Sequence, residues 1–499
     1  MKEWIDLLNA YVWSDYLIYL CLGIGVYFSF RTRFLQVRHL KAMIKLLTEG
    51  KSSKKGVSSF QALAVSISGR VGTGNIAGVA SAIAFGGPGA IFWMWVIAFL
   101  GAGSAFVEST LAQIYKIDQD GQYRGGPAYY IELGLRKKWY AVLFACATII
   151  ATGLFLPGVQ SNSIAAGLKG AFGVDPSITS VLLVVLLSGI IFGGMKRISH
   201  VAEFVVPFMA ITYIVVSLSV IFMNISALPE IFTLIIKSAF AFDATFGGMV
   251  GAAIAFGVKR GIYSNEAGQG TGPHPAAAAE VSHPAKQGLV QAFSVYIDTL
   301  FICTATALMI LITGKYNVTG PDGQVILNQI GDIAAGPIFT QMAVESVFSG
   351  FGSPFIAISL LFFAFTTIMA YYYIAETNVA YLSQTFDSKI LINVLRLMLL
   401  GSVAYGAVKT ADIAWGLGDL GVGMMAWLNI VAIFLLKDKA LLALKDYENQ
   451  KALGRDPIFQ PSKLGISHAP VWDGVASDKK ENKRPAAHKP QTGDFVLQP

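Results

Sequence analysis

Residues 69–78 read Gly-Arg-Val-Gly-Thr-Gly-Asn-Ile-Ala-Gly, and this stretch decides how the chain folds. It lies inside an apolar run from about 57 to 85, which is long enough to cross a lipid bilayer. Glycine weakens the interior of a helix, and a charged side chain at bilayer depth is costly. A broken backbone is tolerated in a membrane only where protein buries it or where it lines a wet cavity. The stretch is therefore either a loop or a broken helix at a binding site.

The composition is that of a membrane protein with many helical spans. The chain has 499 residues, of which 54% are hydrophobic and 13% charged, and its mean hydropathy is +0.59. A soluble domain carries about 25% charged residues. The net charge of +7 lies mostly in loops and in the C-terminal tail, so it does not indicate nucleic-acid binding. Three cysteines lie in apolar runs, and we expect buried free thiols at Cys21, Cys146 and Cys303.

The apolar runs predict eleven membrane spans. They fall at about 15–33, 57–86, 89–115, 139–165, 177–195, 200–224, 244–272, 287–313, 350–381, 391–408 and 412–436. The first run is expected to be a retained span, because Arg31, Thr32 and Arg33 follow it in place of a small-residue cleavage site.

The positive charges predict the orientation. With the N-terminus outside, seventeen Lys and Arg residues fall in cytoplasmic loops and five in external ones. This bias indicates an external N-terminus and a cytoplasmic C-terminus. We expect short surface helices within 229–240 and within the external loop 314–349. From about residue 448 the chain turns polar and proline-rich, which predicts a disordered tail with a basic cluster at Lys479, Lys480, Lys483 and Arg484.

The sequence pattern of the first break returns five spans later. Residues 257–270 read Gly-Val-Lys-Arg-Gly-Ile-Tyr-Ser-Asn-Glu-Ala-Gly-Gln-Gly, and both stretches share the pattern R-x-x-x-x-N-x-A-G. An odd offset gives the two halves opposite orientations in the membrane. A pair of glycine-interrupted spans in corresponding positions is the sequence signal of a transporter built from inverted repeats.

The strings that flank the first break identify a family. Residues 86–101 read Gly-Gly-Pro-Gly-Ala-Ile-Phe-Trp-Met-Trp-Val-Ile-Ala-Phe-Leu-Gly. Together with the two broken stretches, they closely resemble the alanine or glycine:cation symporter family over about 15–437. The resemblance implies an all-α LeuT-type fold of five plus five inverted spans with one extra N-terminal helix. It also implies uptake of small neutral amino acids, L or D, coupled to sodium and in some members to protons.

These expectations divide the chain into four parts. Residues 1–56 form the extra helix and a basic loop, and 57–225 form the first repeat. Residues 226–437 form the second repeat, and 438–499 form a polar cytoplasmic tail. We expect a multi-pass protein of a bacterial-type plasma membrane, with no obligatory protein partner.

Substrate contacts are expected at both breaks and on two further spans. Broken helix ends offer N–H groups to a carboxylate and carbonyl groups to a cation. The candidates are Thr73, Gly74, Asn75, Gln160, Gly261, Ser264, Asn265 and Trp415. Helix capping, interhelical hydrogen bonding and interfacial anchoring are the alternative roles of such residues.

The family's fold implies a sodium site between the first core helix and the eighth. It brings the carbonyl groups of Ser68 and Val71 opposite the hydroxyl groups of Thr366 and Thr367. The alternative is that each threonine bonds back to its own helix.

The charged residues within the spans are expected to pair with one another. Lys259 and Arg260 could contact substrate, but pairing with an acid such as Glu266 or reaching an aqueous vestibule is favoured. No counter-charge can be named for Arg70. Structural pairing is the main expected role of the acids, with proton relay as the alternative, at Glu108, Glu203, Asp298, Glu376 and Asp419.

A sodium-coupled symporter for alanine or glycine is the function that the sequence favours. Proton coupling, or a preference for glutamine or serine, would fit the same family. An ion channel is the alternative from another class, but the breaks form one inverted pair and not a ring of filter loops. Enzyme motifs such as His-Glu-x-x-His and Gly-x-Ser-x-Gly are absent from the sequence, so an enzyme is not expected.

Overall fold

The computed structural model describes residues 2–50, 52–192, 194–243, 245–383 and 388–473, and it is mostly helical. The first half contains α1 (Lys2–Val12), α2 (Asp15–Arg31), α3 (Leu35–Arg38), α4 (Leu40–Leu46), α5 (Ser59–Arg70), η1 (Gly74–Gly78), α6 (Val79–Gly86), α7 (Gly89–Ile114), β1 (Ile117–Gln119), β2 (Gln122–Arg124), α8 (Pro127–Leu135), α9 (Lys138–Ile150), η2 (Ala151–Phe155), α10 (Leu156–Phe172), α11 (Pro176–Ile191) and α12 (Gly194–Met223). The second half contains η3 (Ile225–Ala227), α13 (Leu228–Ala239), η4 (Gly247–Met249), α14 (Val250–Asn265), α15 (Pro273–Ala278), α16 (Pro284–Val295), η5 (Tyr296–Cys303), α17 (Thr304–Thr313), β3 (Asn317–Thr319), β4 (Val325–Asn328), α18 (Pro337–Glu345), α19 (Gly352–Leu382), α20 (Ser388–Val408), α21 (Ala411–Ala452) and η6 (Pro461–Leu464).

Seven helices in the described part of the chain are long and apolar enough to cross a membrane, and the bent pair α1–α2 would make an eighth. Large apolar side chains remain exposed on the outer helices α11, α12 and α20. Examples are Val181, Val185, Phe204, Phe208, Val394 and Leu397. Apolar surface of this extent is expected where lipid replaces water, and the chain is a polytopic helical membrane protein.

Several helical segments are interrupted along their length. Two residues separate α5 from the helical turn that begins at Thr73, and a longer gap separates α14 from α15. Short π-helical segments follow α5, α9 and α16, namely η1, η2 and η5. Such π-turns are rare and occur frequently at functional sites. The predicted break at residues 69–78 is therefore a broken helix and not a surface loop.

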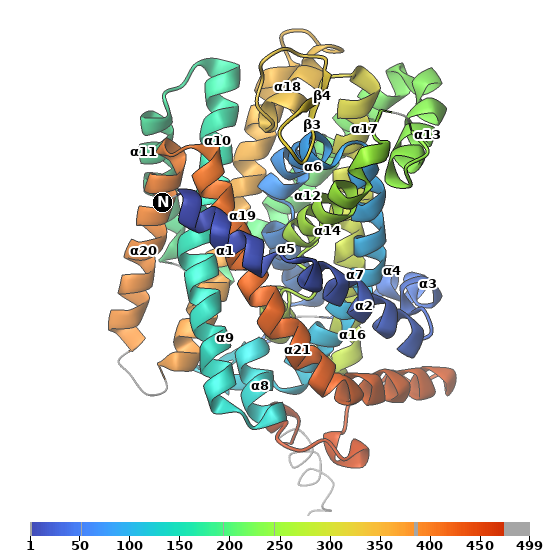
Figure 1. Ribbon diagram of the computed structural model, residues 1–499. Coiled ribbons are helices and arrows are strands. Elements are labelled where there is room, and N and C mark those ends of the chain that lie inside the picture. Colours follow the sequence, from blue (N-terminus) through green and yellow to red (C-terminus); the bar gives the residue numbers. More distant parts are fainter. Residues whose placement is uncertain (1, 51, 193, 244, 384–387, 474–499) are drawn as a thin grey trace, which may run out of the picture.

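The interrupted helices lie at the centre of the bundle. Helix α7 packs against α14 and α16, α10 packs against α19 and α20, and α5 packs between α12 and α19. Figure 1 shows these elements surrounded by α11, α20, α9 and α2. The described residues on both sides of each break are buried, so protein surrounds the freed backbone.

The two ends of the bundle carry different elements. Figure 1 shows α13, α18 and the hairpin β3–β4 at one end, and α8 and the segment after α21 at the other. The helices predicted within 229–240 and 314–349 are confirmed as α13 and α18. The sequence did not predict the antiparallel hairpin of β3 with β4, nor helix α1, which packs against α21.

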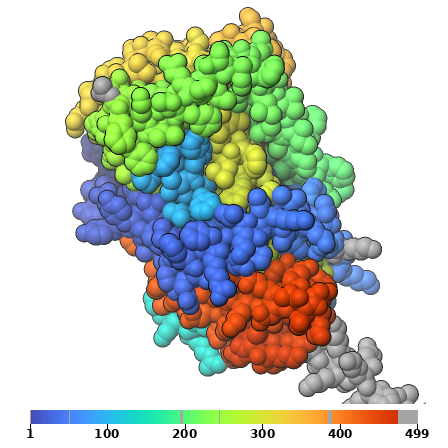
Figure 2. Space-filling view, turned by 90° about the vertical axis from the view of Figure 1, so that its right-hand side faces the viewer, coloured from blue at the N-terminus to red at the C-terminus, as the bar shows by residue number. Residues whose placement is uncertain are grey.

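The C-terminal region differs from the prediction. Helix α21 continues to Ala452, and the following residues pack against the bundle, with Phe459 and Trp472 at 4% and 6% exposure. Figure 2 shows this segment, in orange and red, against the blue residues of the N-terminal region. The expected disorder from residue 448 is thus wrong up to residue 473, because buried aromatic side chains anchor the segment. The predicted basic cluster at 479–484 lies outside the described residues.

The cysteines are free, as the sequence predicted, but they are not all buried. Cys21 and Cys303 are buried, whereas Cys146 is exposed. Cys146 lies on α9, and its exposure shows that an apolar run does not specify which side of a helix faces outward.

Candidate functional site

The first break forms where three helices meet. Helix α5 ends at Arg70, and helical structure resumes at Thr73. No side chain fits at Gly72, because a Cβ there would lie 2.5 Å from Thr367 Oγ1 and 3.0 Å from Gln160 Oε1. Glycine at this position therefore allows α5, α10 and α19 to approach one another.

Side chains accept hydrogen bonds from the backbone N–H groups that this break exposes. The Gly72 N–H donates to Asn75 Oδ1 (2.8 Å), and the Thr73 N–H donates to Gln160 Oε1 (3.0 Å). Asn75 thus caps the second half of the broken helix. Gln160 contacts the break directly, as expected for a polar residue on a core helix.

The second break follows Asn265. Glu266 has a φ of +57°, which turns the chain out of α14, and helical structure resumes in α15. Asn265 Oδ1 accepts from the Ala267 N–H (3.0 Å), and its Nδ2 donates to Thr299 Oγ1 (3.3 Å). Gly261 lies inside α14, where it packs closely against Ile97 of α7. The structure therefore brings Asn265, but not Gly261, to the break.

Asp298 joins the two breaks. Its Oδ1 accepts from Asn75 Nδ2 (2.6 Å) and Ser264 Oγ (3.1 Å), and its Oδ2 accepts from Thr299 Oγ1 (2.7 Å). Gly74 lies beside Ser264, since a Cβ on Gly74 would be 3.3 Å from Ser264 Cβ. The sequence indicates Asp298 as an intramembrane acid but does not place it at the site. The sequence signal that could have placed Asp298 at the site is its position in the span that follows the second break.

Oxygen atoms from α5 and α19 gather beside the first break. The Thr367 hydroxyl lies 2.8 Å from the Ser68 carbonyl oxygen and 3.4 Å from that of Val71. It also lies 3.0 Å from Phe363 O of its own helix, whereas the Thr366 hydroxyl contacts carbonyl groups of its own helix alone and lies 3.9 Å from Met209 Sδ. Only Thr367 of the predicted pair therefore lies opposite the break. Hydroxyl and carbonyl oxygens are the hard ligands that alkali cations prefer.

Two buried hydroxyl groups near the breaks have no hydrogen-bond partner among the described residues. They belong to Thr73 and Tyr263. A Cβ on Gly418 of α21 would lie 3.3 Å from Tyr263 Oη and 2.5 Å from Val159 Cγ2 of α10, so these three residues pack together. Buried hydroxyl groups are costly when unpaired, so both can offer hydrogen bonds to a ligand. Tyr263 is not among the substrate contacts expected from the sequence.

An ion-paired cluster covers one side of the site, toward the end of the bundle that carries α13 and α18 (Figure 1); this end is called the outer end, and the opposite end with α8 is called the inner end. Arg260 donates to Asp419 through both terminal nitrogens (2.9 and 2.8 Å), and Lys259 Nζ lies 2.7 Å from the same carboxylate. The acid that pairs with these cations is Asp419 of α21 and not Glu266, the example that the sequence suggested. This cluster lines an outer cavity of about 610 Å³. The expected pairing of Lys259 and Arg260 with an acid is thus confirmed.

Trp415 lies between this ion cluster and the first break. The Arg260 guanidinium sits 4.6 Å from the Trp415 ring, and Tyr263 packs against the same ring at a centroid distance of 5.0 Å. A Cβ on Gly78 would lie 3.6 Å from the edge of Trp415. The indole therefore lies between the ion cluster and Gly78 and lines the outer cavity, which residues of both broken helices also line.

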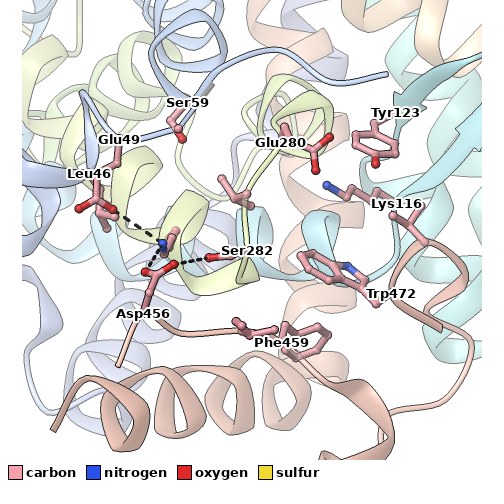
Figure 3. A pocket seen from close by; sticks show the side chains of 15 residues that line it. Leu46, Glu49, Ser59, Lys116, Tyr123, Glu280, Ser282, Asp456, Phe459 and Trp472 are labelled. Carbon is pink, nitrogen blue, oxygen red and sulfur yellow. Dashed lines mark hydrogen bonds and ion pairs between the residues drawn. The ribbon is translucent and has the colours of Figure 1, made fainter. Parts of the chain in front are cut away.

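A second cavity, of about 680 Å³, lies at the inner end of the bundle. Figure 3 shows Lys116, Tyr123, Glu280 and Trp472 at one side of it and Asp456 at the other. Lys116 Nζ lies 4.2 Å from the Tyr123 ring centroid and 5.1 Å from that of Trp472. Burial lowers the pKa of Lys116 to about 7.

The C-terminal segment closes this inner end. Asp456 pairs with Lys286 (2.7 Å), the Phe459 N–H donates to Ser282 O (3.0 Å), and Trp472 Nε1 donates to Gln113 O (2.8 Å). At the same end of the bundle, Val57 attaches the residues before α5 to α15, because its N–H donates to Ala278 O (3.0 Å). The inner cavity is thereby separated from the breaks by paired backbone.

Two broken helices that meet at a buried acid, with a cavity toward each end, define a membrane transporter with a site at mid-bundle. The family model of the sodium:alanine symporter family matches residues 1–461. The chain belongs to this family.

Individual relatives are similar along nearly their whole length. A putative sodium/proton-dependent alanine carrier protein of Bacillus subtilis (strain 168) is 66% identical, over 96% of this chain and 99% of the relative. The sodium/proton-dependent alanine carrier protein of Bacillus sp. (strain PS3) is 51% identical, over 88% and 99%. A probable sodium/glutamine symporter of Bacillus subtilis (strain 168) is 46% identical, over 95% and 97%. The chain is thus a multi-pass protein of a bacterial-type plasma membrane.

A solved structure shares the fold. It is a manganese transporter of Eremococcus coleocola in complex with an aromatic bis-isothiourea substituted compound. It has 13% sequence identity and a TM-score of 0.50, and the match covers 87% of this chain and 97% of that one. At this identity the likeness concerns the fold alone.

The low pKa of Lys116 predicts that docking of residues 456–472 depends on pH. When the segment leaves, Lys116 regains its ordinary pKa of 10.5, so the undocked form binds more protons between about pH 7 and 10.5. Docking is therefore weakest below pH 7 and strengthens as the pH rises above it. Hydrogen exchange of residues 459–472, corrected for intrinsic rates, should be slower at pH 8.5 than at pH 6.5. Lys116→Met should remove the difference, and an unchanged difference in that variant would contradict the assignment.

Proposed function

We propose that the chain is a secondary active symporter that imports small neutral amino acids, alanine or glycine, together with sodium. The observation that carries this proposal is the meeting of two broken helices with a repeated sequence pattern at Asp298, between an outer and an inner cavity. The names of the relatives, alanine carriers dependent on sodium or protons, support the substrate and the ion. Glutamine or serine is the alternative substrate class, supported by the relative named as a glutamine symporter.

The architecture that we propose has eleven spans in a LeuT-type arrangement. The crossing elements are α2, α5–α6, α7, α9–α10, α11, α12, α14–α15, α16–α17, α19, α20 and α21. Four of them do not qualify singly as spans: a break divides α5–α6 and α14–α15, α11 has 16 residues, and α2 is joined to α1 at a bend. The ends of the bundle support an external N-terminus: the basic loops and the C-terminal segment lie at one end, and α13 and α18 at the other. The repeats would comprise residues 57–225 and 226–437.

The substrate would lie between the two breaks, beneath Trp415. The unpaired hydroxyl groups of Thr73 and Tyr263 and the amide of Gln160 would contact its polar groups. Gly74, Ser264 and Asn265 would let the two backbones approach it, with Asn75 holding the first break in shape. The Tyr263 and Trp415 rings would pack over the substrate and disfavour a large side chain, which supports alanine or glycine.

Sodium would lie between α5 and α19. Its proposed ligands are the carbonyl oxygens of Ser68 and Val71 and the hydroxyl of Thr367. The ion and the substrate would then share the first broken helix, since Val71 and Thr73 lie on either side of Gly72. Filling one position would order the backbone that forms the other, which is the physical basis for coupled binding.

Access would alternate between the two cavities. The outer closure consists of the Arg260–Asp419 pair over Trp415, and the inner closure consists of the pairing of Val57 with the segment after α15. Each closure joins the two broken helices or their neighbours, so movement of a broken helix half would open one side at a time.

Purified protein in liposomes should accumulate labelled alanine when sodium is added outside. Accumulation above equilibrium requires coupling to the ion gradient, so replacing sodium with choline should abolish it. Unlabelled alanine and glycine should compete more strongly than glutamine. Passive equilibration that ignores the sodium gradient would refute the symporter, and stronger competition by glutamine would identify the alternative substrate.

Thr367→Ala should weaken sodium binding without preventing folding. Loss of one ligand to a charged ion costs about 1.5–3 kcal/mol, so the sodium concentration for half-maximal uptake should rise about tenfold or more. Thr366→Ala is the matched control, because its hydroxyl bonds within its own helix. Equal effects of the two substitutions would remove Thr367 from the ion site.

Tyr263→Phe should weaken alanine binding while sodium dependence is preserved. A lost neutral hydrogen bond costs about 0.5–1.5 kcal/mol, so the KM for alanine should rise about twofold to tenfold. Tyr296→Phe is the control, since its hydroxyl donates to Gln36 O (3.2 Å) away from the breaks. An unchanged KM in Tyr263→Phe would exclude this hydroxyl as a substrate contact.

A further inference from the structure

A buried cluster of ionisable side chains lies on the inner side of the two breaks. Arg70 ends α5, Glu108 lies near the end of α7, and Glu266 begins the second break; each is at most 2% exposed. Gly272 packs beside two of them, since a Cβ there would lie 2.7 Å from Arg70 Nη2 and 4.0 Å from Glu108 Oε1. A Cβ on Gly69 would lie 3.4 Å from Glu266 Oε2. The cluster therefore connects both broken helices with α7.

Negative charge exceeds positive charge in this cluster. Arg70 is the cation that interacts electrostatically with Glu266, Glu108 and Asp298. It donates through Nη1 to Gln291 O (3.1 Å) and to Ser294 Oγ, whereas its Nε and Nη2 have no hydrogen-bond partner in the described part of the chain. Three buried carboxylates around one guanidinium would leave uncompensated charge, which costs several kcal/mol per ion in a protein interior.

The remaining titratable groups around the cluster supply no second positive charge. They are Tyr130, Tyr263, Tyr371 and His274. Nδ1 of His274 faces Thr271 O at 3.0 Å, and its Nε2 faces the Asn378 amide nitrogen at 2.8 Å. The neutral ring satisfies this arrangement, with Nδ1 donating and Nε2 accepting. With all three acids ionised the cluster would carry a formal charge of −2, and each proton or other cation bound there lowers this excess by one.

Hydrogen-bond donors already stabilise two of the three carboxylates. Asp298 accepts from three side chains, as described above. Glu108 accepts from the Gly268 N–H at Oε1 (3.2 Å) and from Asn429 Nδ2 at Oε2 (2.7 Å). Each oxygen of these two groups thus has a donor, which favours the charged form.

Glu266 differs from the other two acids. Its Oε2 accepts from Thr271 Oγ1 (2.8 Å), and the Tyr371 side chain faces the same carboxyl group, but no described residue lies within hydrogen-bond geometry of the buried Oε1. A buried carboxylate oxygen without a donor is the position at which a proton is bound most favourably. The Arg70 nitrogens without partners lie in the same cluster and do not reach it.

We propose that Glu266 is a proton-binding site and that a proton crosses the membrane on its carboxyl group during transport. This inference rests on the proposed symport function. It assigns the proton, as a coupling ion in addition to sodium, to one residue. The proton adds to Glu266 Oε1 from water while the outer side is open, and it leaves to water when the inner side opens. Because Glu266 contacts the first break at Gly69, its charge changes beside the helix that also holds substrate and sodium.

The test uses the full chain in liposomes that contain a pH-sensitive dye, with the membrane potential clamped by potassium and valinomycin. Adding alanine and sodium outside should acidify the interior in step with alanine uptake. Glu266→Gln should lower the ratio of protons to alanine at least tenfold and remove the dependence of uptake on external pH. Sodium-driven alanine uptake should persist in this variant.

Glu108→Gln is the matched control, because both of its carboxylate oxygens have donors, and it should keep the proton-to-alanine ratio of the unchanged protein. Acidification at the normal ratio in Glu266→Gln would overturn the proposal. A lack of alanine-driven acidification in the unchanged protein would also overturn it. If sodium still drives alanine uptake in that experiment, the proposed symport function is retained and only the proton site is refuted. If Glu266→Gln does not fold, Glu266→Asp should retain acidification with a shifted pH midpoint; an unshifted midpoint would contradict the assignment.

Discussion

Hydrogen bonding of the backbone without water is the constraint on which the rest of this structure depends. Each helix break frees N–H and C=O groups that lipid cannot satisfy. The protein satisfies them with side chains from other helices: Asn75 and Gln160 accept from the first break, and Thr367 lies against its carbonyl groups. The same groups that make a broken helix tolerable also form a set of polar atoms that a small ligand and an ion can share. Stability of the break and ligand binding thus have one origin.

Charged side chains inside the helical bundle are paired in two different ways in this protein. On the outer side, Asp419 pairs with Arg260 and Lys259, so the cluster is compact and close to a cavity. On the inner side, Arg70 meets carboxylates from several elements without a complete set of hydrogen bonds. The first arrangement suits a closure that forms and separates as a unit. The second retains a charge imbalance and an unpartnered carboxylate oxygen, which are the basis of the proposed proton site at Glu266.

The sequence predicted the broken helices, the repeat and the surface helices, because glycine content and apolar length act locally. It did not predict that Thr366 faces its own helix while Thr367 faces the break, since rotation about the helix axis depends on packing. It placed Gly261 at the second break, but this glycine serves close packing against α7. The sequence did not place Tyr263 or Asp298 at the site, because their partners come from spans distant in sequence. The docked C-terminal segment was missed because a few aromatic side chains outweigh its polar composition.

The sequence by itself determined that this protein lies in a membrane, where its helices break and that two halves share one pattern. Those properties follow from transfer energies and backbone preferences of neighbouring residues, which act without tertiary contacts. Tertiary structure decided which polar atoms meet at the breaks, which acid pairs with Arg260 and what closes the inner end. These outcomes depend on side-chain directions from helices far apart in the chain, and only packing brings Asp298, Asn75 and Ser264 within hydrogen-bonding distance.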